Sequence, residues 1–420
     1  MKKIIPLTVT GTFIAAGTLL NQSARAGGIE LYEIATPDVG LASAGYSARA
    51  QDASTLFKNP AGMSLLDGTQ IQAGAQVLYG DVKFSPSQAA PQGGGDGGIA
   101  VGALPGASFF YAQKLNDRVS VGFGSFSYFG LAENYNDDWM GRYYVQKGVL
   151  LGMSLMPGAS VKINDWLSIG GCLNAMYGYL DTKVAINTLG PSDGQLSLSD
   201  YEWGFGGVGG IIITPREGTR IGVTYVSPVK LNFSDTPSFS NLGPLAGLPI
   251  FNSPSALNLG ITVPQSVMFG IYQDLNEQWA LMADVGWQNW SQFGKVDVSY
   301  DANQPNSLTK NLNYDDTWHG ALGAKYKYSE EWAFTGGVAY DSSAVNDANR
   351  TVTLPMGQAY RFGVGADWQV RDSLSVNLAY EFMWAGDMSV NQTSAYRGNV
   401  VGSYENAWFS FFTANVTWKF

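Results

Sequence analysis

The sequence predicts an all-β fold: a 14-stranded antiparallel transmembrane β-barrel with an N-terminal hatch, or plug, inside its lumen. Three observations predict it. Apolar and polar residues alternate along many segments, as they do in strands with two unlike faces. Short turns alternate with long connections, and aromatic residues gather beside the short turns. Only 14% of the 420 residues are charged, although the mean hydropathy is a neutral −0.04.

The alternation is clearest at the C-terminal end, where apolar residues at every second position from Phe412 to Phe420 alternate with polar ones. Similar patterns occur at 279–288, 332–341, 360–368 and 374–382. A soluble β-sandwich would also alternate, so alternation alone does not identify the solvent. Trp166, Trp279, Tyr328 and Trp332 stand beside short turns, which favours an interfacial aromatic girdle and therefore a barrel in a membrane.

The turns determine the expected number of strands. Short turns are expected at 114–118, 163–166, 214–218, 274–278, 328–332 and 370–373. Long Gly-, Pro-, Asn- and Ser-rich connections are expected near 81–106, 130–148, 183–200, 233–263, 299–313, 341–358 and 386–404. With both chain ends on the short-turn side, this order requires fourteen strands, and bacterial barrels have even strand numbers.

The chain divides into three parts. Residues 1–26 are typical of a secretory signal peptide, with Lys2 and Lys3 before an apolar stretch and small residues at its end. A membrane anchor is the alternative, and Pro6 disfavours it. No later stretch has the ~18 consecutive apolar residues of a transmembrane helix. We therefore predict an exported protein of the bacterial outer membrane, with residues 27–68 as the hatch and 69–420 as the barrel.

Charge and residue counts exclude several kinds of partner. The formal net charge of −10 and pI of about 4.6 oppose nucleic-acid binding. With one cysteine, Cys172, and one histidine, His319, the chain has neither an intrachain disulfide nor a multi-Cys/His metal site. We expect no cofactor, no metal and no nucleic-acid partner.

Residues 27–68 lack clean alternation and precede the first predicted strand, so the lumen is the natural place for them. A disordered periplasmic tail is the alternative, but the segment is not charged enough to favour disorder. Its turn Asn59-Pro60-Ala61 has few alternative shapes, because proline fixes one dihedral angle and asparagine caps or turns locally. We interpret these residues as a hatch motif, with an ordinary tight turn as the alternative.

Several short motifs, in this order and spacing, resemble the FadL family of outer-membrane transporters for long-chain fatty acids and other hydrophobic compounds. The resemblance covers essentially the whole mature chain. The motifs are GGIELYE at 27–33, DASTLFKNPA at 52–61, FGLA at 129–132, WGFG at 203–206, TY at 224–225, VK at 229–230, WQNWSQF at 287–293, DSS at 341–343 and NR at 349–350. The resemblance implies a fourteen-stranded barrel, a hatch with an Asn-Pro-Ala motif, and a kinked third strand that opens a window in the wall.

Two departures concern the ligand. The connection at 183–200 is much shorter than its counterpart in the fatty-acid member, where that loop helps form an outer capture groove. Before the tenth strand, where the fatty-acid member has a basic residue, this chain has Tyr314-Asp315-Asp316. Both departures put a carboxylate ligand in question, so a neutral alkane or aromatic hydrocarbon stays open beside a fatty acid.

Two apolar features are candidates for handling such a ligand. The outer connection at 233–263 contains five large apolar side chains, interpreted as a capture groove or, alternatively, as an internally packed cap; they are Leu242, Leu245, Leu248, Ile250 and Phe251. Gly130, between Phe129 and Leu131, could bend or end its strand and open the wall. Ordinary packing is the alternative for this glycine.

Two polar residues are expected to face the lumen. Arg361 could contact a carboxylate head group, but pairing with a lumenal acid such as Asp367 or Glu381 is the commoner arrangement. His319 could serve an outer-membrane lipid hydrolase, but no nucleophile motif accompanies it.

We therefore predict a passive, non-enzymatic transporter of hydrophobic molecules. A ligand is captured by the outer loop, enters an apolar pocket and leaves through the wall when the hatch shifts. Its partners are the hydrophobic ligand, outer-membrane lipid and lipopolysaccharide, and nothing demands more than a monomer. A lipid hydrolase and a general diffusion porin are the alternatives.

Overall fold

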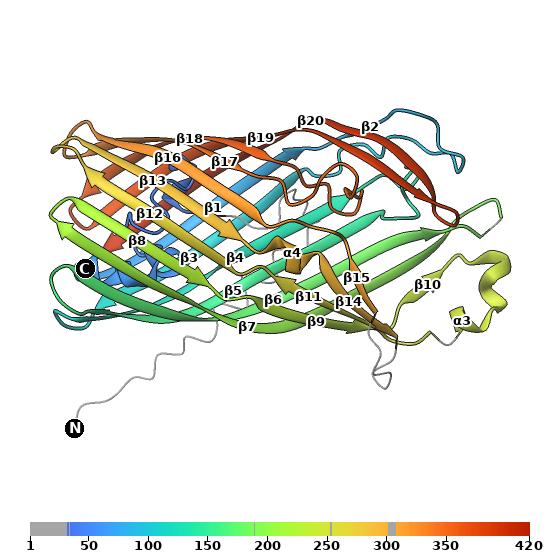
Figure 1. The fold of residues 1–420 in the computed structure, drawn as a ribbon, viewed down its shortest axis with the longest axis horizontal. Helices are drawn as coiled ribbons and strands as arrows, with labels where there is room; N and C mark the ends of the chain where they lie inside the picture. The colour runs from blue at the N-terminus through green and yellow to red at the C-terminus, as the bar shows by residue number, and fades with distance from the viewer. Residues whose placement is uncertain (1–31, 33, 189, 253, 301–307) are drawn as a thin grey trace, which may run out of the picture.

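The computed structural model describes residues 32, 34–188, 190–252, 254–300 and 308–420, so the predicted signal peptide lies outside the described residues. Fourteen antiparallel strands form a closed barrel, which confirms the predicted fold, and β1 pairs with β20 to close it (Figure 1). In chain order the barrel strands are β1 (Thr69–Asp81), β3 (Ala103–Lys114), β4 (Val119–Asn134), β5 (Lys147–Lys162), β6 (Leu167–Ile186), β7 (Gly194–Arg216), β8 (Thr219–Val226), β12 (Ser266–Asp274), β13 (Trp279–Gln288), β16 (Thr317–Lys327), β17 (Trp332–Asp341), β18 (Ala359–Arg371), β19 (Leu374–Ser394) and β20 (Gly398–Lys419).

The two ends of the barrel differ. The six short turns lie at one end together with the C-terminus, and the long connections lie at the other, which we call the outer end (Figure 1). At the short-turn end Phe420 donates its backbone N–H to the carbonyl of Thr69 at 2.9 Å, so the last residue is joined to the first barrel strand. The β1–β20 pairing is unbroken from Gln70–Lys419 to Asp81–Trp408, so this seam leaves no open strand edge, as a closed barrel in lipid requires.

The side chains follow the predicted alternation. The apolar residues of β18 and β20 point outward, with Phe362, Val364, Phe412 and Val416 all exposed, whereas Arg361 is buried. Trp166, Trp279, Tyr328 and Trp332 are exposed at the short-turn end. The outer face is therefore apolar with an aromatic girdle, as in membrane-spanning barrels. Among the helices that the structure describes, none is long and apolar enough to cross a membrane.

Several expected loops are more regular than predicted. The connection at 386–404 is mostly a continuation of β19 and β20, and 183–200 is largely an extension of β6 and β7. The other outer connections contain further elements: β2 (Phe84–Pro86), β9 (Val229–Asp235), β10 (Ser238–Ser240), η3 (Gly243–Gly247), α3 (Pro249–Asn252), β11 (Leu257–Val263), α4 (Trp290–Phe293), β14 (Lys295–Tyr300) and β15 (Leu308–Asn311). Four of these strands, in the order β15-β14-β11-β9, form a separate four-stranded sheet.

This four-stranded sheet packs against the barrel wall. Leu231 and Phe233 of β9 are buried. Leu231 packs so closely on Gly178 of β6 and Gly204 of β7 that a Cβ atom on either glycine would overlap it. Both glycines are on the inward-facing side of their strands, because their neighbours Tyr177 and Trp203 are more exposed. The sheet therefore lines the lumen near the outer end and adds an apolar face to it.

The described part of the N-terminal segment, residues 34–66, runs inside the barrel. It contains η1 (Pro37–Leu41), α2 (Thr55–Lys58) and η2 (Pro60–Leu65). The η1 helix contacts β16 to β20, whereas η2 contacts β3 to β7 on the other side of the barrel. Almost every residue of the segment is buried. It therefore bridges opposite walls of the lumen.

Small residues in the wall make room for this segment. A Cβ on Gly222 would overlap the backbone carbonyl of Ser47, and one on Gly337 would overlap that of Leu41. These positions belong to rows of glycines paired across neighbouring strands: Gly222 with Gly270, Gly170 with Gly210, and Gly323 with Gly337 and then Gly363. Only glycine allows two backbones to approach this closely. Part of the glycine excess is thus explained by the contact between wall and segment.

We expect Gly222→Val to push residues near Ser47 away from the wall while the barrel still folds, because the new side chain would overlap backbone atoms. Proteoliposomes containing the variant should then swell several-fold faster in a small sugar than those with the wild type. Gly209→Val is the matched control, because a Cβ there meets nothing within 4 Å. Equal, slow swelling of all three proteins would contradict this assignment.

Candidate functional site

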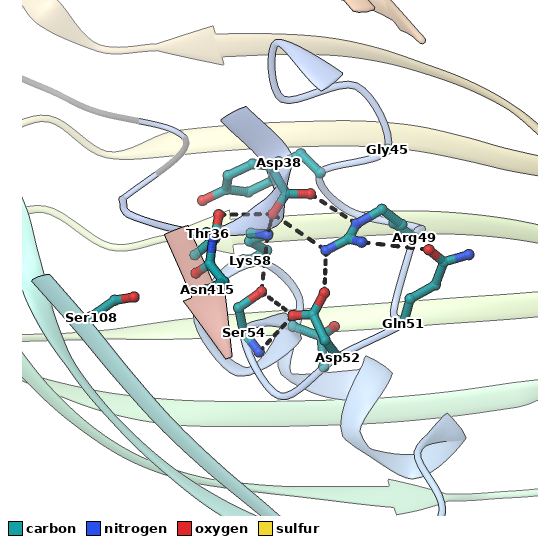
Figure 2. Close-up of polar contacts among 12 residues, drawn as sticks. Thr36, Asp38, Gly45, Arg49, Gln51, Asp52, Ser54, Lys58, Ser108 and Asn415 are labelled. Atoms are coloured by element: carbon teal, nitrogen blue, oxygen red, sulfur yellow. Dashed lines mark hydrogen bonds and ion pairs between the residues drawn. The ribbon is translucent and has the colours of Figure 1, made fainter. Parts of the chain in front are cut away.

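A cluster of charged residues holds the N-terminal segment together (Figure 2). Asp38 is fully buried and forms ion pairs with Lys58 and with Arg49, whose Nε lies 2.8 Å from Asp38 Oδ1. Arg49 also pairs with Asp52, and Lys58 donates to Ser54 Oγ at 3.1 Å. Two acids thus balance two bases. Removing any one partner would leave an uncompensated buried charge, at a cost of about 3–5 kcal/mol.

The Asp52 carboxylate shows the same balance. Burial by itself raises its pKa, but the Arg49 charge and hydrogen bonds from Ser54 outweigh burial and hold the pKa below the ordinary 3.8. A carboxylate with a lowered pKa stabilises the fold above its unfolded-state value and loses that contribution as pH falls through the folded-state value. Asp52 therefore carries its negative charge at neutral pH.

Asn59, the first residue of the Asn-Pro-Ala motif, links the segment to the wall. Its Nδ2 donates to the carbonyls of Ser47 at 2.7 Å and of Ile211 in β7 at 3.0 Å. Its Oδ1 accepts from Ala61 N–H at 3.1 Å and so caps η2, where Pro60 is the first residue. Proline suits this position because its missing N–H would have no helical partner. The motif is thus both a helix start and an anchor.

A second anchor was not anticipated from the sequence. Asp284 of β13 is buried, and its Oδ2 accepts hydrogen bonds from the backbone N–H groups of Gly45 and Tyr46, the latter at 3.0 Å. Ser47 adds a contact to Thr224 of β8 at 3.1 Å. The turn at 45–47 is thereby tied to β8 and β13, close to the Asn59 anchor. The only sign of this anchor in the sequence was that Asp284 is an acid at an inward-facing position of its strand.

Above these anchors lies a continuous apolar cluster, which we call the lumenal cluster. Phe57 of the segment packs against Phe110 and Phe126 of the wall, with ring centroids 5.8 and 4.9 Å apart. Further members come from the kink region, the inner sheet and the outer connections: Tyr128, Phe129, Leu131, Leu150, Leu231, Phe233, Trp290, Phe293, Tyr314 and Leu354. An apolar molecule could therefore stay in contact with apolar side chains from the outer connections to the N-terminal segment.

The hydrogen-bond ladder of the barrel wall is interrupted beside this cluster. The β3–β4 ladder ends at the pair Ser108–Phe126, although β3 remains paired with β1 as far as Ala103 and β4 with β5 as far as Asn134. Residues 103–107 and 127–134 therefore face each other without a ladder between them. Phe129 and Leu131 are buried on the lumenal side of this gap.

The position of the strand irregularity differs from the prediction. The register of β4 against β5 shifts between Ser127 and Phe129, whereas Gly130 pairs regularly with Leu151 and has no positive φ. A Cβ on Gly130 would make ordinary contacts with Leu151 at 3.4 Å and Leu104 at 3.6 Å. The bulge is thus at Tyr128, and Gly130 contributes a small residue at the gap.

Arg361 is engaged by acids. Its Nε lies 2.6 Å from Asp341 Oδ2, and one terminal nitrogen lies 3.2 Å from Glu381 Oε1. The expected partner Glu381 is correct, but Asp367 instead pairs with Lys325 at 3.0 Å. Asp341 was missed because it ends its strand, where alternation no longer fixes direction.

A cavity of about 110 Å³ adjoins Arg361, lined by apolar residues such as Trp290, Met356 and Met383 together with Asp341 and Thr317. His319 lies nearby, with its Nδ1 2.7 Å from Asp341 Oδ1 and its ring centroid 4.4 Å from that of Tyr32. The carboxylates of Asp341 and Glu381 both pair with the Arg361 guanidinium. Arg361 therefore has no surplus positive charge to offer an anionic head group in this cavity.

The outer apolar residues lie around η3 and α3, beyond the end of the barrel (Figure 1). Leu242 is buried against the β6–β7 connection, Leu248 is exposed, and Leu245 and Phe251 are half-buried. Phe251 packs on Phe239 with ring centroids 5.0 Å apart. Ile250 belongs to α3. The region is thus partly an internal cap and partly an open apolar surface.

A closed, lipid-facing barrel with its own N-terminal segment in the lumen defines an integral outer-membrane protein. A family model described as "Outer membrane protein transport protein (OMPP1/FadL/TodX)" matches residues 17–420, and the chain belongs to this family. This agrees with the resemblance seen in the sequence motifs and places the protein in the bacterial outer membrane.

Curated relatives and solved structures agree with this assignment. The chain is 26% identical to the "Long-chain fatty acid transport protein" of Escherichia coli, covering 90% of this chain and 92% of the relative. It is 25% identical to "Outer membrane protein P1" of Haemophilus influenzae, covering 90% and 89%. A solved Pseudomonas aeruginosa FadL homologue has a TM-score of 0.85 at 21% identity, covering 94% of this chain and 100% of that chain. The toluene transporter TodX of Pseudomonas putida has a TM-score of 0.70 at 18% identity, covering 95% and 99%.

Replacing Asn59 tests the anchor. Asn59→Ala leaves the carbonyls of Ser47 and Ile211 without this donor, which should destabilise the segment by about 1–3 kcal/mol. Hydrogen exchange of residues 45–62 should accelerate, with the barrel strands unchanged. Asn59→Asp keeps the acceptor for Ala61 but lacks the donors, so it should behave like the alanine variant. Unchanged exchange in both variants would show that the anchor is not stabilising.

Proposed function

We propose that the protein transports hydrophobic small molecules across the outer membrane by passive diffusion, and that they leave the lumen through the gap between β3 and β4. The observation that carries this proposal is the end of the β3–β4 ladder at Phe126, directly beside the lumenal cluster. Relatives named for long-chain fatty acids and for toluene support a hydrophobic solute.

The proposed route has three stages. The apolar surface around Leu248 and Phe251 at the outer end captures the solute. The lumenal cluster and the cavity beside Arg361 then hold it. Residues 27–68 act as the hatch, because their described part, residues 34–66, contacts opposite walls of the lumen. The gap lined by Phe129, Gly130 and Leu131 offers an exit that avoids the hatch core.

Energetics require such a release step. Burial of a sixteen-carbon chain gains about 0.8 kcal/mol per methylene, or roughly 12 kcal/mol before entropic costs, which would trap the ligand. A coupled change in the pocket must weaken this binding. A shift of Tyr32, which packs against His319 and Arg361 at the cavity, would change the pocket in this way.

The alternatives are less well supported. A hydrolase would need a nucleophile on His319, but among the described residues nothing hydrogen-bonds to its Nε2. A general porin would need an open lumen, whereas the N-terminal segment contacts both sides of the barrel. We therefore assign neither activity.

A charge in the gap should block the exit. Gly130→Lys should reduce uptake of a hydrophobic substrate several-fold, because the solute would have to pass a bulky cation between Leu104 and Leu151. Uptake is measured in cells that produce equal amounts of folded barrel, judged by heat-modifiable gel mobility. Gly209→Lys, on the outward face of β7 and away from the gap, is the matched control. Normal uptake by Gly130→Lys would refute the lateral exit.

A further inference from the structure

Glu133 is an unusual residue in the lumenal wall. Phe129, Leu131 and Glu133 occupy alternate positions on β4 and therefore share one face, and all three are buried. Phe129 and Leu131 belong to the lumenal cluster. Glu133 pairs with Gly148 of β5 just beyond the bulge, where β3 no longer covers β4. The inward face of β4 beside the gap is therefore apolar at Phe129 and Leu131 and ends with the carboxyl group of Glu133.

Among the residues that the structure describes, neither carboxyl oxygen of Glu133 has a hydrogen-bond partner, although the residue is only 1% exposed. Leaving such a group buried and unsatisfied costs several kcal/mol. Most other buried charges of the lumen are paired, as in Asp38 with Lys58 and Arg361 with Asp341. A wall position that merely packs would be filled by an apolar residue, so Glu133 calls for a specific explanation.

The polar groups around Glu133 are already engaged. Burial raises the pKa of Tyr135, and the nearby Glu133 charge raises it further. The hydroxyl of Tyr135 is hydrogen-bonded to that of Tyr404 at 2.6 Å and lies 3.2 Å from the carbonyl of Val352. Arg350 is also near, because the charges of Arg350 and Glu133 both influence the pKa of Tyr314. Its guanidinium donates to Asp347 and to the carbonyls of Met356, Ser389 and Val345.

We propose that Glu133 binds the head group of an amphiphilic solute, a hydroxyl or amine that donates a hydrogen bond to the carboxyl while its alkyl chain lies on Phe129 and Leu131. This assignment rests on the proposed function and names a ligand class for the same path. A donor head group supplies the partner that Glu133 lacks, and the apolar face supplies the contact for the chain.

The surrounding charges select against an anionic head group. A carboxylate ligand would meet another acid at Glu133, and Arg361, which lines the separate cavity described above, is occupied by Asp341 and Glu381. A site built to hydrogen-bond a ligand also discriminates strongly against analogues without that group, because its own polar atom is then left unpaired. The site therefore favours an alcohol or amine over both the matching carboxylate and the matching alkane.

The test is a competition assay on the full mature protein in detergent, with a fluorescent hydrophobic reporter displaced by decan-1-ol, decylamine, decane or decanoate. We expect the wild type to prefer the alcohol and the amine. Glu133→Leu should weaken their binding about tenfold, the loss expected for one hydrogen bond to a buried carboxyl group, and leave decane unchanged. Glu133→Gln, which keeps an acceptor oxygen, should retain most of the alcohol affinity. Glu405→Leu removes an exposed acid of β20 and is the matched control.

The outcomes separate this assignment from the proposed function. If Glu133→Leu remains folded by heat-modifiable gel mobility and shifts all four probes equally or none of them, Glu133 is not a head-group residue and the assignment is overturned. If the wild type binds none of the probes, the proposed function fails, and this assignment fails with it. Selective loss of alcohol and amine binding supports both.

Discussion

The close approach of two backbones inside the barrel is the constraint on which the rest of the structure depends. The carbonyls of Leu41 and Ser47 lie against Gly337 and Gly222, where any side chain would overlap them. Asp284 and Asn59 then fix the same segment by hydrogen bonds to backbone groups. Because the segment contacts opposite walls of the lumen, we propose that a solute leaves through the wall.

The polar and apolar parts of the lumen have different roles. The charges of the N-terminal segment are paired with one another and stabilise its shape, whereas the lumenal cluster offers a continuous apolar surface. The loss of the β3–β4 ladder beyond Phe126 brings this surface to the edge of the barrel. Burial of apolar surface gives a hydrophobic solute its affinity, and the Glu133 carboxyl, which has no partner among the described residues, gives the path a basis for selecting head groups.

Alternation, the aromatic girdle and the order of short turns and long connections together predicted the fold, because lipid excludes charge from one face of each strand and the lumen tolerates it on the other. The fourteen strands follow from the turns, and the inward direction of Arg361 follows from the alternation. The glycine rows, the inner sheet of β9, β11, β14 and β15, and the partner Asp341 depend on contacts between residues far apart in sequence, so periodicity carries no signal for them. The sequence carries no signal that Glu133 is buried, because its burial depends on contacts with residues far away in the chain.

The most direct test of lateral exit is to map where a solute lies on its way out. A diazirine-bearing hydrophobic probe, photoactivated during uptake, can be located by mass spectrometry of the labelled peptides. Lateral exit predicts labels on β3 near Leu104 and on β4 near Gly130, and none at the short-turn end of the lumen near Gln72 and Thr417, both buried inside the barrel. Labels concentrated at Gln72 and Thr417, with none at the gap, would contradict it.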